Sequence, residues 1–369
     1  MNRRQLATAL LLPLVLRITA VRVSQAPAAT FESEENMTEP KQRMIETNGI
    51  RLNIAEQGEG PLVVLAHGFP ESCYSWRHQI GALAAAGFHV VAPDMRGYGK
   101  SDAPQPIDQY TMLHLVGDMV GVLDALGAPT AVIVGHDWGA SVAWQAALLR
   151  PDRFRAVVAL SVPFRPRGKA PPTSLMPRTE DAQFYQLYFQ EPGPAEAEFE
   201  RDPRATIRNM LFGGSGDGVA AARAAASGEP TENFAMVPKG AGFLRGAGAP
   251  ETLPPWISES DIDVYAAEFK RTGFRGGLNY YRNIDRNWEL LGAMVGLKVT
   301  VPALYIAGDR DLVVSFPGTD QLLASLNKLV PGLRGIKMLP GCGHWTQQER
   351  PSEVNAALVE FLQALPGRG

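Results

Sequence analysis

An aspartate lies at the centre of a short turn between two segments with the patterns of buried elements. The turn is Gly135-His136-Asp137-Trp138-Gly139-Ala140; residues 130–134 are typical of a buried strand, and residues 141–150 are typical of a helix. Small residues around Asp137 permit the tight strand-to-helix turn that raises one side chain above an α/β sheet. A carboxyl group with an ordinary pKa of about 3.9 is ionised at neutral pH and can attack carbon without an activating base.

This chemistry favours opening of a strained ring, or displacement of a leaving group from saturated carbon, over direct acyl transfer. The alternative is an aspartate that only caps the following helix. Attack by Asp137 would leave an ester, which water must clear with the help of a general base. Histidine is the natural base at neutral pH.

Of the six histidines, His344 is best placed to act as this base. It lies in Gly341-Cys342-Gly343-His344-Trp345, between a predicted strand and the last predicted helix. An acid that orients it should follow the preceding strand, where Gly308-Asp309-Arg310-Asp311 offers both Asp309 and Asp311. The order nucleophile, acid, histidine along the chain is that of the α/β-hydrolase arrangement.

Two further turns follow apolar segments. His67-Gly68-Phe69-Pro70 comes after the predicted strand 62–66. We expect the backbone N–H groups of Phe69 and Trp138 to form an oxyanion hole for the ester's tetrahedral intermediate, the alternative being a plain Gly-Pro turn. The glycine-rich residues 213–218 lack the lysine and the preceding strand of a phosphate-binding loop. We interpret them as a flexible connection.

The elements that must position these side chains follow one pattern on both sides of a long interruption. A hairpin is predicted over 43–58 with Asn48-Gly49 as its turn. Strands at 62–66, 89–92, 130–134 and 156–160 then alternate with helices at 76–86, 110–126 and 141–150. Strands at 301–307 and 335–339 and a helix at 351–365 resume the alternation. Between them, residues 163–296 show helical segments at 182–189, 195–212 and 260–272 and no strand alternation.

The predicted fold class is therefore α/β, with an α/β-hydrolase core, a mostly parallel sheet and a helical cap (lid) insertion. Residues 43–162 and 297–369 form the two parts of the core, and residues 163–296 form the cap. Residues 1–29 have the order of a secretory signal or a membrane-proximal targeting segment: Arg3 and Arg4, an apolar run over 6–16, then small residues. Residues 30–42 are polar and acidic, like a linker. If the signal is genuine, the protein is exported (secreted or periplasmic); otherwise it is cytoplasmic.

Composition narrows the class of partner. The net charge is −3 with no basic stripe, which argues against nucleic acid. Cys73 and Cys342 are too few for a disulfide framework, although a single bridge is an option in an exported protein. No His/Cys cluster has metal-ligand spacing. We expect neither metal nor cofactor.

The chain resembles the epoxide hydrolases of the α/β-hydrolase superfamily, of the soluble type. The resemblance covers residues 43–364 and rests on the Gly-His-Asp-Trp-Gly elbow, the His-Gly-Phe-Pro turn and the Cys-Gly-His-Trp loop. Its most specific parts lie in the cap, at Phe184-Tyr185-Gln186-Leu187-Tyr188-Phe189-Gln190-Glu191-Pro192-Gly193 and Gly273-Phe274-Arg275-Gly276-Gly277-Leu278-Asn279-Tyr280-Tyr281-Arg282-Asn283. One departure is Cys73, where the resemblance predicts a bulky aromatic residue beside the oxyanion turn.

The resemblance implies hydrolysis of an epoxide to a vicinal diol through an Asp137 alkyl ester. It assigns Tyr185 and Tyr281 as cap donors to the ring oxygen, and Asp311 as the acid of the Asp137–His344–Asp311 triad. A one-residue shift would exchange these tyrosines with Tyr188 or Tyr280. The implied partners are a small apolar epoxide and water, with no stable membrane partner required. The alternatives are a haloalkane dehalogenase, with Trp138 contacting halide, and a ligand-binding α/β-hydrolase protein without turnover. The natural epoxide, its regiochemistry and enantiomer, the physiological role and the oligomeric state are not encoded in any pattern we identify.

Overall fold

The main sheet is built from six strands that precede the cap in the chain and two that follow it. The structure is a computed structural model that describes residues 39–225, 235–244 and 248–366. Within these ranges eight strands form one sheet: β1 (Lys41–Thr47), β2 (Ile50–Gln57), β3 (Leu62–Ala66), β4 (His89–Pro93), β5 (Ala131–His136), β6 (Phe154–Leu160), β9 (Ala303–Gly308) and β10 (Leu333–Leu339). Their order is β1-β2-β4-β3-β5-β6-β9-β10. β1, β2 and β4 pair antiparallel, and β4 through β10 pair parallel.

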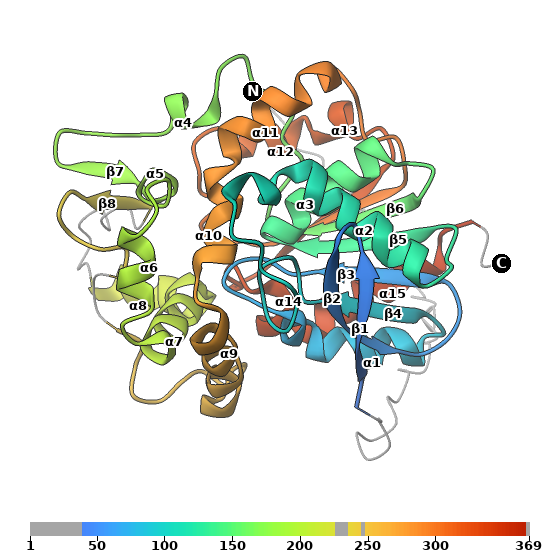
Figure 1. Ribbon diagram of the computed structural model, residues 1–369, viewed down its shortest axis with the longest axis horizontal. Coiled ribbons are helices and arrows are strands. Elements are labelled where there is room, and N and C mark those ends of the chain that lie inside the picture. The colour runs from blue at the N-terminus through green and yellow to red at the C-terminus, as the bar shows by residue number, and fades with distance from the viewer. Residues whose placement is uncertain (1–38, 226–234, 245–247, 367–369) are drawn as a thin grey trace, which may run out of the picture. The chain divides into compact units, whose positions relative to one another are not determined.

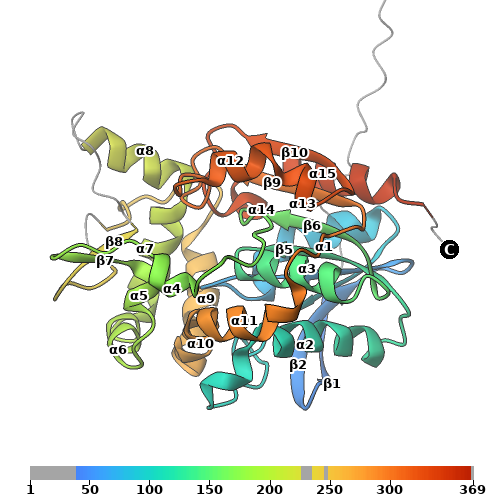
Figure 2. The same cartoon turned by 90° about the horizontal axis from the view of Figure 1, so that it is seen from above.

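Helices cover both faces of this sheet, as Figures 1 and 2 show. They are α1 (Arg77–Ala85), α2 (Met112–Ala125), α3 (Trp138–Leu149), α12 (Thr319–Ala324), α13 (Leu326–Leu329), α14 (Thr346–Glu349) and α15 (Pro351–Gln363), with 3-10 turns at Cys73–Trp76 and Ile107–Tyr110. One buried cluster joins α1 and α15 to the sheet, and another joins α2, α3 and the cap to it. The predicted α/β-hydrolase class with a mostly parallel sheet is confirmed.

Residues 163–296, which we call the cap, add no strand to the main sheet. Their described elements are α4 (Pro172–Leu175), β7 (Ala182–Phe184), α5 (Tyr185–Tyr188), α6 (Pro194–Phe199), α7 (Pro203–Gly214), α8 (Gly216–Ala225), β8 (Met236–Pro238), α9 (Glu259–Thr272), α10 (Arg275–Arg282), α11 (Ile284–Leu290) and a 3-10 turn at Leu291–Met294. β7 and β8 pair as a separate antiparallel ribbon. In Figures 1 and 2 the helices α5 to α9 lie beyond one end of the main sheet.

Two of the helical predictions in the cap are wrong in detail. The segment 182–189 begins as the strand β7 before it becomes α5, because residues 182–184 pair with β8. The segment 195–212 is broken between α6 and α7. There Pro203 occupies the first turn of α7, and the Asp202 carboxylate caps that helix by accepting from the N–H of Ala205. A proline and a capping aspartate start a new helix.

Parallel pairing brings the carboxyl ends of β3, β5, β6, β9 and β10 to one edge of the sheet. In α/β sheets such an edge is where ligands bind. The oxyanion turn follows β3, the aspartate elbow follows β5, Asp311 follows β9 and His344 follows β10. The topology therefore gathers residues that are far apart in the chain.

Both cysteines are buried free thiols. Cys73 packs in the α1–α15 cluster with Trp76 and Ile80, whereas Phe69 and Tyr281 belong to the other cluster. Its side chain thus fills the core, and its departure from the expected aromatic residue is a matter of core packing. No helix of the described ranges is long and apolar enough to cross a membrane. The predicted signal and most of the predicted linker lie outside the described residues.

Candidate active site

Asp137 stands on a strained turn between β5 and α3. Its backbone has φ 52° and ψ −117°, a region that side-chain-bearing residues rarely occupy. Gly135 and Gly139 make the turn feasible, since a Cβ on either would overlap a neighbouring backbone oxygen. The carboxylate makes no capping hydrogen bond to α3. The structure therefore argues against the helix-cap alternative, and strain at a functional turn is common.

The backbone on both sides of the site acts on this carboxylate. The N–H of Phe69 donates to Oδ1 of Asp137 at 2.9 Å. The N–H of Trp138 is a second donor, and both lower the pKa of Asp137. The side chain keeps 15% of its surface exposed. The predicted oxyanion turn thus lies against the aspartate elbow.

His344 lies between Asp137 and Asp311. Its Nδ1 is 3.0 Å from Oδ1 of Asp311, and its Nε2 is 3.7 Å from Oδ2 of Asp137. Asp309, the other candidate acid, is exposed and accepts the N–H of Gly341 instead. Asp311 is fully buried, and its Oδ1 also accepts the N–H of Val313. The geometry therefore brings His344 together with Asp311 and not with Asp309.

The electrostatics of this group favour a charged histidine. Burial lowers the pKa of His344, but the charges of Asp311 and Asp137 outweigh it and raise that pKa to about 9. Burial also raises the pKa of Asp311, yet the charge and hydrogen bond of His344 bring it below its usual value. For Asp137 burial dominates, and its pKa is raised. At neutral pH a protonated His344 therefore lies between Asp137 and Asp311.

Tyr185 and Tyr281 bring cap side chains over the elbow. The Tyr281 ring packs edge-on against the Trp138 ring at 5.1 Å and against the Phe69 ring at 5.6 Å, and it lies 6.1 Å from the Tyr185 ring. Burial raises the pKa of both phenols, and the charge of Asp137 raises each further. Both are therefore neutral hydrogen-bond donors at pH 7.

The neighbouring tyrosines have their hydroxyl groups occupied elsewhere. The hydroxyl of Tyr188 donates to Oε2 of Glu198 at 2.8 Å, inside the cap. That of Tyr280 donates to the carbonyl of Arg96 at 3.0 Å, in the core. The hydroxyl of Tyr185 accepts from the side-chain amide of Gln186 at 2.9 Å, and the charge of Asp137 acts on the phenols of Tyr185 and Tyr281.

Three residues of the site were missed by reasoning from the sequence. Glu71 is fully buried; its Oε2 accepts from the N–H of Gly68 and lies 2.7 Å from Nδ1 of His136. Burial raises the pKa of Glu71, but the His136 ring and these donors lower it to about 2. Nε2 of His136 faces the carbonyl oxygen of His344 at 2.7 Å, so Glu71 and His136 brace the backbone of the base.

Ser161 is the third of these residues. It follows β6 with φ 72°, and its hydroxyl lies 3.0 Å from Nδ1 of His344. His136 lies within the aspartate elbow, Glu71 directly follows the His-Gly-Phe-Pro turn, and Ser161 follows a predicted strand. Position in the sequence was therefore a signal for all three, although it did not indicate their contacts.

Aromatic rings surround the two cap tyrosines. Phe189 packs 5.0 Å from the Tyr281 ring and 5.5 Å from the Tyr185 ring. Phe184 and Phe243 pack against Tyr185 at 4.7 and 5.8 Å. Together these rings form an aromatic wall around the two phenols.

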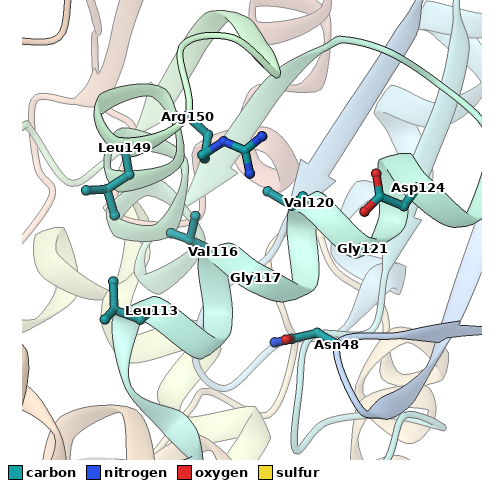
Figure 3. A pocket seen from close by; sticks show the side chains of 9 residues that line it. All are labelled: Asn48, Leu113, Val116, Gly117, Val120, Gly121, Asp124, Leu149 and Arg150. Atoms are coloured by element: carbon teal, nitrogen blue, oxygen red, sulfur yellow. The ribbon is translucent and has the colours of Figure 1, made fainter.

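Two surface grooves in the described part of the chain lie away from this cluster. One of about 420 Å³ is bounded by α2, the β1–β2 turn at Asn48 and the end of α3 (Figure 3). The other, of about 680 Å³, lies between the start of α7 and α9. Neither is lined by a predicted site residue. No group of three or more His, Cys, Asp or Glu within the described ranges is arranged to hold a metal ion.

Comparison with known proteins places these features in a family. Residues 61–351 match the model of the alpha/beta hydrolase fold family. Epoxide hydrolase A of Mycobacterium tuberculosis is 50% identical over 89% of this chain and 99% of its own length. Epoxide hydrolase 3 of Siraitia grosvenorii is 44% identical over 86% and 96%. The crystal structure of epoxide hydrolase A from Mycobacterium thermoresistibile has a TM-score of 0.80 and 50% identity, covering 88% of this chain and 99% of that one.

Proposed function

The chain belongs to the epoxide hydrolases of the α/β-hydrolase superfamily, and from this we propose that it opens its epoxide through a covalent ester of Asp137. The observation that supports this mechanism is the placement of Asp137. One carboxylate oxygen accepts the N–H of Phe69, the other lies 3.7 Å from Nε2 of His344, and His344 is itself paired with Asp311. A haloalkane dehalogenase would share the elbow but would not need the paired cap tyrosines.

In the first step Oδ2 of Asp137 attacks one ring carbon, and the bond from that carbon to the ring oxygen breaks. Tyr185 and Tyr281 donate hydrogen bonds to the ring oxygen, and one of them transfers its proton to the alkoxide. A neutral phenol suits this role, because it can protonate an alkoxide and yet stays un-ionised at pH 7. The product of this step is a 2-hydroxyalkyl ester of Asp137.

In the second step water attacks Cγ of the ester. His344 takes one proton from the water and passes it to the departing diol oxygen. The N–H groups of Phe69 and Trp138 stabilise the negative charge on the tetrahedral intermediate. The second proton of the water remains at first on the regenerated Asp137 carboxyl group. When it dissociates, it replaces the proton that the phenol donated in the first step. Asp311 keeps the His344 ring oriented throughout.

Removal of the cap hydroxyl groups tests the first step. We expect Tyr185→Phe and Tyr281→Phe each to slow ring opening by about 10²-fold, since proton donation by a positioned side chain contributes about 10²–10⁴-fold. The double variant should lose more than either single one. Rapid mixing with mass spectrometry of the protein measures ester formation directly.

Tyr188→Phe and Tyr280→Phe are matched controls, because each removes a hydroxyl group that is already bound to Glu198 or Arg96. They should leave the rate of ring opening within about threefold of the wild type. If a control variant loses more of the ring-opening rate than Tyr185→Phe does, the donor role belongs to a different tyrosine.

The two steps should differ in their pH dependence. In the free enzyme His344 is protonated below pH about 9, in part because of the charge of Asp137. Esterification removes that charge, so the pKa of His344 falls, its proton is released to solvent, and the neutral base becomes available. We expect ester hydrolysis to accelerate with rising pH through a pKa below 9 and then level off, while ring opening stays nearly constant from pH 7 to about 9. Hydrolysis that slows with rising pH would contradict the role of His344.

Isotope transfer tests the ester route as a whole. Enzyme in excess hydrolyses styrene oxide, and separately an aliphatic terminal epoxide, once in oxygen-18 water. The ester route predicts an unlabelled diol and label in the peptide that contains Asp137, because water attacks the ester carbonyl. A labelled diol with an unlabelled peptide would mean direct attack of water on the ring. If no diol forms, halide release from haloalkanes tests the alternative.

The aromatic wall of Phe184, Phe189 and Phe243 supports a small apolar epoxide as the substrate. The order of residues in the N-terminal segment supports export as a further proposal. Mass spectrometry of the protein from the culture fluid or periplasm tests the export proposal. A full-length chain found only in the cytoplasm would contradict it.

A further inference from the structure

The glycine-rich residues 213–218 are bound to the loop that carries His344. They join α7 to α8 in the cap, and Ser215, Gly216 and Gly218 are buried. The N–H of His344 donates to the carbonyl of Gly214 at 2.8 Å. The indole N–H of Trp345 donates to the carbonyl of Leu211 at 2.7 Å. The interpretation of this segment as a flexible connection is therefore wrong.

A single buried carboxylate ties the two segments together. Oε2 of Glu349 accepts from the N–H of Gly216 at 2.8 Å, in the cap, and from that of Gly343 at 2.9 Å, in the catalytic loop. Its Oε1 accepts from the N–H of Trp345 at 3.0 Å. Hydrogen bonds to a charged acceptor are about twice as strong as neutral ones.

The glycines permit close approach of two backbones. A Cβ on Gly216 would overlap the carbonyl oxygen of Gly341, and a Cβ on Gly343 would overlap the backbone of residues 214–216. Glycine is required at such contacts because it has no side chain. The low complexity of the segment thus reflects packing.

The backbone of His344 is held from both sides as a result. Its N–H is bound by Gly214 of the cap, and its carbonyl oxygen is bound by His136 of the core. We propose that residues 214–216, the part of this segment that touches the His344 loop, are a positioning element through which the cap sets the place of His344 and thereby the rate of ester hydrolysis. This proposal rests on the two-step mechanism proposed above.

Gly216→Ala tests the proposal, because the added methyl group must push the cap segment away from the His344 loop. We expect ester hydrolysis to slow by about 10–100-fold, since a displacement of about 1 Å at a catalytic group costs on the order of 10²-fold. Ester formation, which depends on Asp137 and the tyrosines, should change by less than about threefold. Rapid mixing with intact-protein mass spectrometry separates the two rates.

Gly218→Ala is the matched control. Its methyl group would overlap the carbonyl oxygen of Phe212, a contact within the cap, and so disturbs packing without touching the His344 loop. Should Gly216→Ala fail to fold, Trp345→Phe removes the hydrogen bond to Leu211 together with part of the buried indole ring, and it should also slow hydrolysis selectively.

Slower ester decay in Gly216→Ala with unchanged decay in Gly218→Ala supports the proposal. Equal effects in both variants, or unchanged decay in Gly216→Ala and Trp345→Phe, would overturn it. Absence of any ester in His344→Gln would contradict the two-step mechanism itself, and the positioning proposal with it.

Discussion

Asp137→Asn should reduce turnover by at least about 10⁴-fold, the scale of loss when the nucleophile of a catalytic triad is removed. The amide cannot form the ester, so no mass increase of the protein should follow mixing with an epoxide. The fold should survive, because the amide oxygen can still accept the N–H of Phe69. Burial penalises the carboxylate, so the melting temperature should equal or exceed that of the wild type.

Asp309→Asn is a suitable control for the loss of one carboxylate near the site. Asp309 is exposed and contacts the Gly341 N–H, not His344, so its variant should keep nearly full turnover. Steady-state diol formation by both variants is the measurement. Residual activity above about 1% in Asp137→Asn, with deamidation to aspartate excluded by mass, would show that Asp137 is not the nucleophile.

His344→Gln should trap the ester. Glutamine cannot take a proton from water, so hydrolysis should slow by about 10⁴-fold or more. Ring opening does not need a base, and one equivalent of epoxide should add to each enzyme molecule. Intact-protein mass spectrometry then shows an increase equal to the mass of the epoxide, located by peptide mapping at Asp137.

His114→Gln is the control for this variant. His114 lies on α2, where its Nδ1 contacts the Thr111 hydroxyl, and it contacts no site residue. It should turn over normally with no lasting adduct. A His344→Gln protein that neither turns over nor gains mass would contradict the covalent mechanism, whereas an adduct on another residue would assign the nucleophile elsewhere.

Much of the core fold was predictable because the sequence patterns that indicate it lie within short segments of the chain. Short apolar strands between turns identify a parallel sheet, and parallel strands place their carboxyl ends at one edge. Small residues around Asp137 identify a turn that only a few backbone conformations can make. His344 follows β10 and the two candidate acids follow β9, so the shared edge of parallel strands also accounts for their position.

The choice between Asp309 and Asp311 needed the folded chain. Both lie in one turn, and two residues of sequence separation do not say which side chain turns inward. The structure buries Asp311 against His344 and leaves Asp309 exposed. The tyrosine pair likewise follows from the directions of α5 and α10, since each has a neighbouring tyrosine that points to a different partner.

The sequence by itself determined the core fold, the aspartate elbow and the order of the candidate triad. Only the tertiary structure decided which groups hold the triad in place. Glu71 reaches His136 across 65 positions of the chain, and Gly216 reaches Glu349 across 133. Contacts of this range arise when layers pack together, so no local period or spacing encodes them. Residues 213–218 illustrate this point, because a glycine-rich composition suits either a flexible link or a close contact between two backbones. Only the carbonyl of Gly341 and the carboxylate of Glu349, packed against Gly216, identify the close contact.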